Sequence, residues 1–471
     1  MLLLVATSVA SFAQTPPCPN PPPVTISPNP PSDVCIPTGF PGNPIAFFDD
    51  FSWRSFIAMV WPVLEGMRGI PDDSKSIGPV TTPLVFETLK ADWEVFQPPN
   101  GANPPPAPSQ FNTYAGANPC AGFGLPSVGF GQLVLASFSK FDNLGEAGFG
   151  NLVGPVPAQS GFYTRYFTAF NQTEFNQILS QSLYLRDNLK HGVTFSPGSI
   201  DVKAAWINMA GVQNPQRYYT RTAWVLNPFS TPDPTCTPIT VGLVGLHIVQ
   251  KTPSRPQWIW STFEQIDNVP GGTSSGPFAY NSGNAKAMPN SNPLSFPPTL
   301  GEPIPAVHLF NVQRLTPIHP STIAINAKYQ GALQGKGGPW QFYQLVMTQW
   351  PLVPSQPSQP GTPNNTFPGL NNSSSAFANV ALETFDQTNI RTGCMSCHTQ
   401  TSTTNPSECS ATKICTDFLW SLNLNAYPSA LAPPSEPMLV LRSRPQLTLA
   451  ARKLSPQLQA LKQLMQAART R

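Results

Sequence analysis

Helices are predicted where apolar residues recur every three or four positions. The segment 49–62 opens with two aspartates and ends at a proline, which is typical of a complete helix. Its apolar face consists of Trp53, Phe56, Ile57, Val60 and Trp61. A second aromatic face predicts a helix across 84–96, and both faces are expected to be buried, since core packing is the usual role of such side chains. Further helices are expected at 174–185 and 322–333.

Strands are predicted in the middle of the chain, where β-branched and aromatic residues alternate with polar ones. This alternation is clear in 199–207 and 218–226. Two further runs, 240–250 and 257–263, flank the turn-forming stretch 251–256 and therefore predict a hairpin. The remaining candidate strands are 162–170, 306–316 and 340–350. An antiparallel sheet is the simplest arrangement of these elements.

The pattern changes after residue 353. A stretch rich in Pro, Asn and Ser, 354–375, is typical of a linker. Apolar positions in 377–389 then predict a helix, and 416–422 predicts a shorter one. The tail 437–471 has no acidic residue, and its last part predicts a basic amphipathic helix. Such a helix docks on an acidic partner or an anionic membrane surface, or closes the fold as a solvated helix.

Composition points to export and away from nucleic acid. Charged residues are 10% of the chain, against about 25% in average proteins, and a net charge of +3 gives no strong electrostatic steering. The apolar run Met1–Ala13 predicts a secretory signal cleaved before Gln14, although it lacks a basic n-region. No other run approaches about 18 apolar residues, so we expect no transmembrane segment and a periplasmic or secreted protein.

Five residues carry the most specific chemistry in the sequence. Cys394-Met395-Ser396-Cys397-His398 matches Cys-x-x-Cys-His, the attachment pattern for a c-type haem. At this spacing both thiols can form thioethers to one porphyrin, and His398 becomes the proximal iron ligand. The alternatives are a redox dithiol, which would require a βαβ context, and a zinc site completed by Cys409 and Cys415. That zinc site is disfavoured because five residues, rather than two, lie between those cysteines.

Six cysteines remain outside this motif, and an even number in an exported protein predicts disulfides. We expect Cys18 to pair with Cys35 and Cys409 with Cys415, as local loops. Cys120 and Cys236 are then left as a long-range pair, although connectivity cannot be deduced from sequence.

The sixth iron ligand decides between an electron carrier and a protein that binds small molecules. Met438, preceded by a proline, is one candidate, and His247 is another. His308 or His319 is a further option, and an open site is the last. Ionisable and indole groups concentrate around His247: Lys251, Arg255, Trp258, Trp260, Glu264 and Asp267. These groups form either a haem-facing surface, with Lys251 or Arg255 pairing the propionates, or salt bridges at the end of a sheet.

These predictions combine into an α+β fold: an antiparallel β-rich body with N-terminal helices, and a C-terminal helical segment that resembles cytochrome c and carries the haem. The proposed boundaries are a signal peptide at 1–13, a Pro-rich arm at 14–43, the body at 44–353, the linker at 354–375 and the haem segment at 376–471.

The sequence also resembles a family of exported bacterial proteins described as cytochrome c family proteins. The resemblance rests on the aromatic first helix, Val202–Trp206, Lys251–Trp258, Phe263–Asn268, Tyr343–Trp350, and the Cys-x-x-Cys-His motif followed by Asp417 and Phe418. It implies one covalent haem c at Cys394 and Cys397 with His398 as ligand, and it implies no particular substrate. The expected function is one-electron transfer with a partner protein. The alternative is a haem enzyme or small-ligand-binding protein with an open distal site built by the β-rich body.

Overall fold

A computed structural model describes most of residues 17–429. Within that range it leaves out 81, 100–103, 115–117, 137–163, 228–234, 273, 282, 284–285, 287, 291–310, 352–377, 385–386, 388–392, 399–400 and 402–413. The predicted signal, the whole linker and the basic tail therefore lie outside the described residues.

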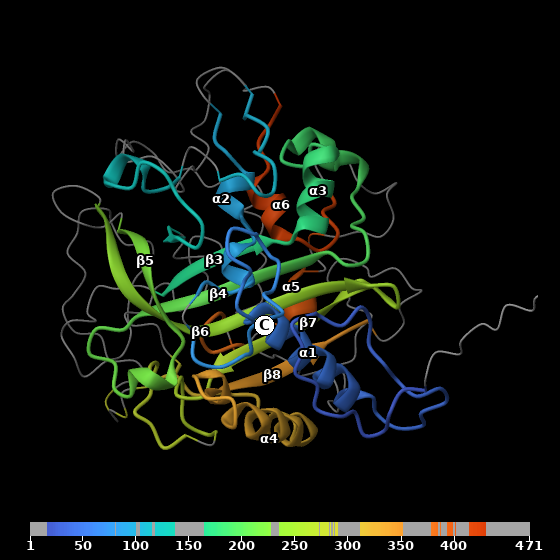
Figure 1. Cartoon of the computed structure of the whole chain (residues 1–471). Coiled ribbons are helices and arrows are strands. Elements are labelled where there is room, and N and C mark those ends of the chain that lie inside the picture. The colour runs from blue at the N-terminus through green and yellow to red at the C-terminus, as the bar shows by residue number, and fades with distance from the viewer. Residues whose placement is uncertain are drawn as a thin grey trace, which may run out of the picture.

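The described chain is built on one mixed sheet of eight strands that curves like half a barrel (Figure 1). Most of the sheet follows the order β1 (Lys90–Ala91), β3 (Arg165–Phe170), β4 (Ile200–Asn208), β6 (Thr235–Thr252), β5 (Thr220–Asn227) and β2 (Leu133–Leu135). Two further strands, β7 (Arg255–Gln265) and β8 (Tyr343–Gln349), extend from β6. All pairs are antiparallel except the parallel pair β2 and β5.

Strand β6 is the branch point of the sheet. Residues 235–242 pair with β5, and residues 245–252 pair with β7. Strand β4 pairs with 241–250, so it occupies the opposite edge of β6. From Val241 to Thr252 nearly every side chain of β6 is buried, because both faces of the sheet are covered there. This double burial explains why the sequence of β6 is a continuous apolar run rather than an alternating one.

Two helices cover one face of β7 and β8 (Figure 1): α1 (Ile45–Met59) and α4 (Pro320–Gln334). The indole of Trp53 stacks on Tyr329 at 5.1 Å and meets Phe263 of β7 edge-on, which joins both helices to the sheet. Asn326 accepts a hydrogen bond from Trp53 Nε1 at 2.9 Å and also donates to the carbonyl of Leu345 in β8. The aromatic face predicted for the first helix is thus part of the core.

The opposite face of the sheet is covered by the C-terminal part of the described chain. Residues 378–384 cross β6 and β7 in tight turns rather than as a helix. Asn379 donates to Thr262 Oγ1 at 2.9 Å, and the backbone N–H of Val380 donates to Glu264 Oε1 at 2.6 Å. Gly245 of β6 lets this segment lie flat, because a Cβ there would stand 3.2 Å from the Cβ of Ala381. We call this surface the docking face.

Short helices complete the described structure. They are α2 (Asp92–Val95), α3 (Gln172–Ser180), α5 (Cys394–His398) and α6 (Trp420–Asn425). The remaining turns are 3₁₀ in character: Phe86–Thr88, Ala121–Phe123, Arg186–His191, Pro215–Arg217 and Trp340–Phe342. Among the described residues, no helix is long and apolar enough to cross a bilayer.

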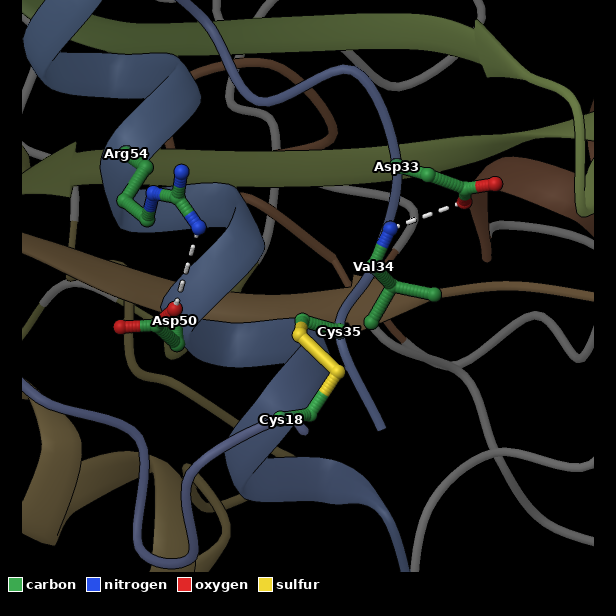
Figure 2. Close-up of a disulfide and its surroundings, with 6 residues drawn as sticks. All are labelled: Cys18, Asp33, Val34, Cys35, Asp50 and Arg54. Carbon is green, nitrogen blue, oxygen red and sulfur yellow. Dashed lines mark hydrogen bonds and ion pairs between the residues drawn. A yellow bond between two sulfur atoms is a disulfide. The ribbon is translucent and has the colours of Figure 1, made fainter. Parts of the chain in front are cut away.

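The Pro-rich arm packs along the sheet as irregular extended chain. Cys18 and Cys35 form a disulfide within it, and Figure 2 shows this bridge close to α1. Inside the loop that this disulfide closes, Asp33 accepts hydrogen bonds from the backbone and side chain of Ser254 in the turn between β6 and β7. The expected long-range pair, Cys120 with Cys236, is also present. Cys415 is disulfide-bonded as well, while its expected partner Cys409 lies outside the described residues.

The predicted α+β fold class is wrong. The chain is β-rich with few helices, and the described part of the C-terminal region contains no helical segment resembling cytochrome c. The helix expected at 377–389 is replaced, where it is described, by turns whose apolar residues Val380 and Leu382 insert singly into the docking face. The helix expected at 84–96 is also wrong. It is divided between a 3₁₀ turn, strand β1 and the one-turn helix α2, because Glu87 and Glu94 are buried in ion pairs there.

A buried carboxyl in α1 should make stability fall as pH rises. Burial raises the pKa of Asp49 from 3.8 to about 7, despite hydrogen bonds from Thr322 and Thr348. The folded state therefore binds this proton more tightly than the unfolded state does. The associated stability is complete below about pH 4 and is lost as pH rises to about 7, with a maximum on the order of 4 kcal/mol. Asp49→Asn should be more stable than the natural chain at pH 8 and equal to it near pH 4.

Denaturant midpoints at pH 4, 6 and 8 measure this effect. Asp72 serves as the control, because its hydrogen bonds with Ser74 lower its pKa, so Asp72→Asn should not reproduce the gain at pH 8. If Asp49→Asn brings no gain in stability at pH 8, the proposed neutral state of Asp49 is wrong.

Docking of residues 378–384 should depend on the missing side chain at position 245. In Gly245→Ala the added methyl meets Ala381, Asn379 and Leu382 at 3.2 to 3.3 Å, so we expect a loss of about 1–2 kcal/mol. Gly331→Ala in α4 is the matched control, since nothing lies within 4 Å of a Cβ there and alanine favours helix by about 0.5–1 kcal/mol. Chemical denaturation of both variants checks this, and equal stabilisation of the two would contradict tight docking at Gly245.

Candidate functional site

The Cys-x-x-Cys-His motif forms the one-and-a-half-turn helix α5 on the docking face, next to β7 (Figure 1). A five-residue helix is too short to be stable alone, so tertiary contacts must hold it. The side chain of Met395 is fully buried, and its backbone N–H donates to Gln349 Oε1 of β8 at 2.9 Å. Cys394 and His398, at the two ends of the helix, remain half-buried. The side chain of Cys397 lies outside the described residues.

His398 is held in one orientation by a backbone carbonyl and an indole. Its Nδ1 lies 2.6 Å from the carbonyl oxygen of Phe418. A carbonyl only accepts hydrogen bonds, so Nδ1 carries the proton and donates it. The lone pair is therefore on Nε2, the nitrogen that is left to bind a metal. The ring of Trp260 in β7 lies 4.3 Å from the imidazole, centroid to centroid, at an angle of 51°.

The carbonyl that contacts His398 belongs to a backbone turn in an uncommon conformation. Asp417 has φ 50° and Phe418 has φ 73°, both in the left-handed region that favours glycine. Trp258, which contacts this turn from β7, has φ 69°. Each such residue costs on the order of 1–3 kcal/mol, and such residues cluster at functional sites. Three of them converge beside the motif.

A buried ion pair holds this turn against the sheet. Lys251 Nζ in β6 lies 2.5 Å from Asp417 Oδ2, and both side chains are less than a tenth exposed. The same carboxylate oxygen accepts the backbone N–H of Phe195 at 2.7 Å, and Trp258 Nε1 donates to the Asp417 carbonyl at 3.1 Å. Side chain and backbone of Asp417 are therefore fixed from three separate parts of the chain.

A second set of hydrogen bonds connects the turn back to α5. The backbone N–H of Thr416 donates to the carbonyl of Thr401 at 3.0 Å, and its hydroxyl donates to the carbonyl of Leu419 at 2.7 Å. The hydroxyl of Thr401 in turn donates to the carbonyl of His398 at 2.9 Å. The turn 416–419 and the end of the motif helix thus form one closed hydrogen-bonded unit.

Buried acids surround the ion pair. Burial raises the pKa of Asp417, although the Lys251 ammonium acts to lower it. Burial, with the neighbouring charges of Asp201 and Asp417, raises the pKa of Glu174 in α3 well above its usual range. In Asp201 of β4, burial together with the charge of Asp92 raises the pKa in the same way. Burial therefore favours the neutral form of Glu174 and Asp201, whereas Asp417 has the Lys251 ammonium beside it as a compensating charge.

The ionisable groups of the β6–β7 hairpin serve mainly to fix the chain on the two faces of the sheet. Lys251 pairs with Asp417, and Glu264 pairs with Arg314 while accepting the N–H of Val380. Arg255 lies on the α1 side, where its guanidinium stands over the ring of Phe48 at 5.1 Å. Lys251 and Arg255 were predicted as partners of the haem propionates, and in the structure Lys251 contacts Asp417 and Arg255 contacts Phe48.

The candidates for the sixth iron ligand are scattered. His247 lies on β6 on the same face as Trp260, with its Nε2 3.8 Å from Glu383 Oε2. His319 caps α4 by accepting the N–H of Ser321, and α4 covers the opposite face. Met438 and His308 lie outside the described residues. The sixth ligand therefore stays a prediction.

Sequence reasoning missed the groups that orient His398. Asp417 and Phe418 belong to the helix predicted at 416–422, which in the structure begins only at Trp420, and Trp260 was noted only as part of an ionisable and aromatic hairpin. A backbone carbonyl carries no residue-type signal, and the contact between His398 and Trp260 spans more than 130 residues. The zinc alternative loses support, since Cys415, one of its ligands, is disulfide-bonded.

Comparison of the chain with models of protein families, with curated proteins and with solved structures found no match. Two disulfides in the described chain fit an oxidising, extracytoplasmic setting.

Proposed function

We propose that this chain is an exported c-type haem protein that carries out one-electron transfer in the periplasm or outside the cell. One haem would be held by thioethers to Cys394 and Cys397, with His398 as the proximal iron ligand. The observation that carries the proposal is the hydrogen bond from His398 Nδ1 to the carbonyl of Phe418, because in the neutral imidazole it makes Nε2 the nitrogen that would ligate iron.

The described residues fit this group. Iron-ligating histidines commonly donate their other ring N–H to a carbonyl or carboxylate, which fixes the tautomer and raises the basicity of the ligand. Here Phe418 supplies the carbonyl, and Trp260 limits rotation of the ring. Cys394 lies at the other end of the same short helix and is half-buried. When bound, the haem would supply an iron that cycles between the ferric and ferrous states.

Electron transfer is favoured over catalysis by the surroundings of the motif. The two charged side chains that hold the turn against which His398 is oriented, Lys251 and Asp417, are paired with each other and buried. They orient the ligand and are not placed to exchange protons with a substrate. The partner would be a redox protein, and docking through the basic tail at 437–471 belongs to this proposal.

The first test is covalent haem content after export in cells that carry a haem c maturation system. We expect a haem that stays with the denatured polypeptide and gives a pyridine haemochrome spectrum of the c type. The variant with Cys394→Ala and Cys397→Ala should lose it, because no thioether can form. The double variant Cys120→Ser with Cys236→Ser is the control, since it removes two cysteines remote from the motif and should retain covalent haem.

The ferrous protein with carbon monoxide then distinguishes the two kinds of haem protein. Low-spin iron whose spectrum does not respond to carbon monoxide supports a saturated electron carrier. High-spin iron that binds carbon monoxide would replace that function with ligand binding or catalysis. A natural chain that is exported and folded but carries no covalent haem, while a known cytochrome matures in the same cells, would refute the proposal.

A further inference from the structure

We infer that the turn 416–419, clamped by the ion pair between Lys251 and Asp417, is a positioning element that fixes the tautomer of His398 and thereby sets the reduction potential of the iron. The part concerning the tautomer rests on this chain alone. The part concerning the potential rests on the proposed function. Lys251, Asp417 and Trp258 are positioning residues in this scheme, because they act through the Phe418 carbonyl.

The backbone of the turn is the first argument. Elsewhere in the chain the left-handed conformation is taken mainly by glycine, as at Gly337 and Gly338. At 417 and 418 the chain instead places an aspartate and a fully buried phenylalanine in that conformation. Phenylalanine gains nothing locally from a positive φ. The conformation therefore depends on contacts from outside, and its result is a carbonyl directed at His398.

The ion pair is the second argument. Removing two charges from water costs so much that a buried pair is often no more stabilising than apolar residues of the same size. A contribution to stability alone thus accounts poorly for Lys251 and Asp417. Their geometry accounts for them better, since Lys251 and the N–H of Phe195 bind the same oxygen of Asp417 while Trp258 binds its carbonyl. These three contacts together fix the position of the Asp417 backbone.

The chemistry of an iron-bound imidazole is the third argument. A histidine that donates its Nδ1 proton into a firm hydrogen bond acquires partial imidazolate character, and it is then a stronger donor to iron. Stronger donation stabilises the ferric state and lowers the reduction potential. Weakening the bond between His398 and Phe418 should have the opposite effect. The clamp would therefore hold the potential below the value that a freely rotating His398 would give.

The principal test variant combines Lys251→Met with Asp417→Asn. It removes both charges together, so the net charge near the motif is unchanged, and asparagine tolerates the positive φ at position 417. Trp258→Phe is a milder second variant, which deletes the hydrogen bond to the Asp417 carbonyl and leaves both charges in place. Any shift they share therefore reports on positioning, and not on a change of local charge.

Two readouts apply. The first is nitrogen-15 NMR of the histidine rings in the full chain expressed without haem maturation. The chain has only five histidines, so the ring of His398 can be assigned through a His398→Gln variant. We expect the ratio of the Nδ1–H to the Nε2–H tautomer to fall about two- to tenfold in the double variant, the factor for loss of one neutral hydrogen bond. Trp258→Phe should lower the ratio less.

The second readout is spectroelectrochemistry of the haem-loaded protein. The ratio of ferrous to ferric iron at a fixed applied potential should rise by a similar factor. Glu94→Gln is the matched control, because it disrupts an equally buried ion pair, with Arg68 at 2.8 Å, far from the motif in sequence. It should lower stability without changing either ratio.

The outcomes separate the two proposals. A folded double variant, or a folded Trp258→Phe if the double variant does not fold, with an unchanged tautomer ratio would overturn the positioning role. A changed tautomer with an unchanged potential would overturn the link to the iron. Absence of covalent haem in the natural chain would refute the proposed function, while the NMR measurement would still decide the role of the clamp.

Discussion

The ammonium of Lys251 is the constraint on which the geometry of the motif depends. The side chain is buried against the sheet, where an unpaired charge would be very costly, so a carboxylate must pair with it there. Asp417 does so, and in doing so it brings the turn 416–419 onto the docking face. The carbonyl of Phe418 is held there by that contact and orients His398, while Met395 and Gln349 hold α5 itself on the sheet. A weakly stable five-residue helix thus depends on contacts with the sheet rather than on its own hydrogen bonds.

Charge is scarce in this chain, and much of it is internal. Arg68 with Glu94, Lys251 with Asp417 and Arg314 with Glu264 are all ion pairs with little or no exposure. Each connects segments that are distant in sequence or irregular in structure, so the pairs define register where no helix or strand does. The cost appears in groups such as Asp49 and Glu174, whose raised pKa values reflect carboxyls buried without full compensation.

Strands β3 to β8 could be predicted from sequence because they are long and rich in β-branched and aromatic residues, whereas the short strands β1 and β2 were not predicted. The hairpin of β6 and β7 and the helices α1 and α4 fell close to their predicted bounds. The C-terminal region could not, because residues 378–384 satisfy their backbone through Thr262 and Glu264 of the sheet rather than through one another. Apolar residues such as Val380 and Leu382 suggest a helix face only when that partner surface is unknown. The motif was found from its spacing, whereas the groups that orient His398 come from tertiary contacts.

The docking face also determines what can be separated from this molecule. In a small cytochrome, the polypeptide around the haem is a self-contained module that can be cut out, duplicated or fused. Here His398 is oriented by Phe418, which lies close in sequence, but also by Trp260 and, through Asp417, by Lys251, which belong to the sheet. A fragment beginning near residue 376 would keep the Cys-x-x-Cys-His motif but would lack Trp260 and Lys251, which help to orient His398. The orientation of His398 therefore requires both the motif and the sheet on which it packs.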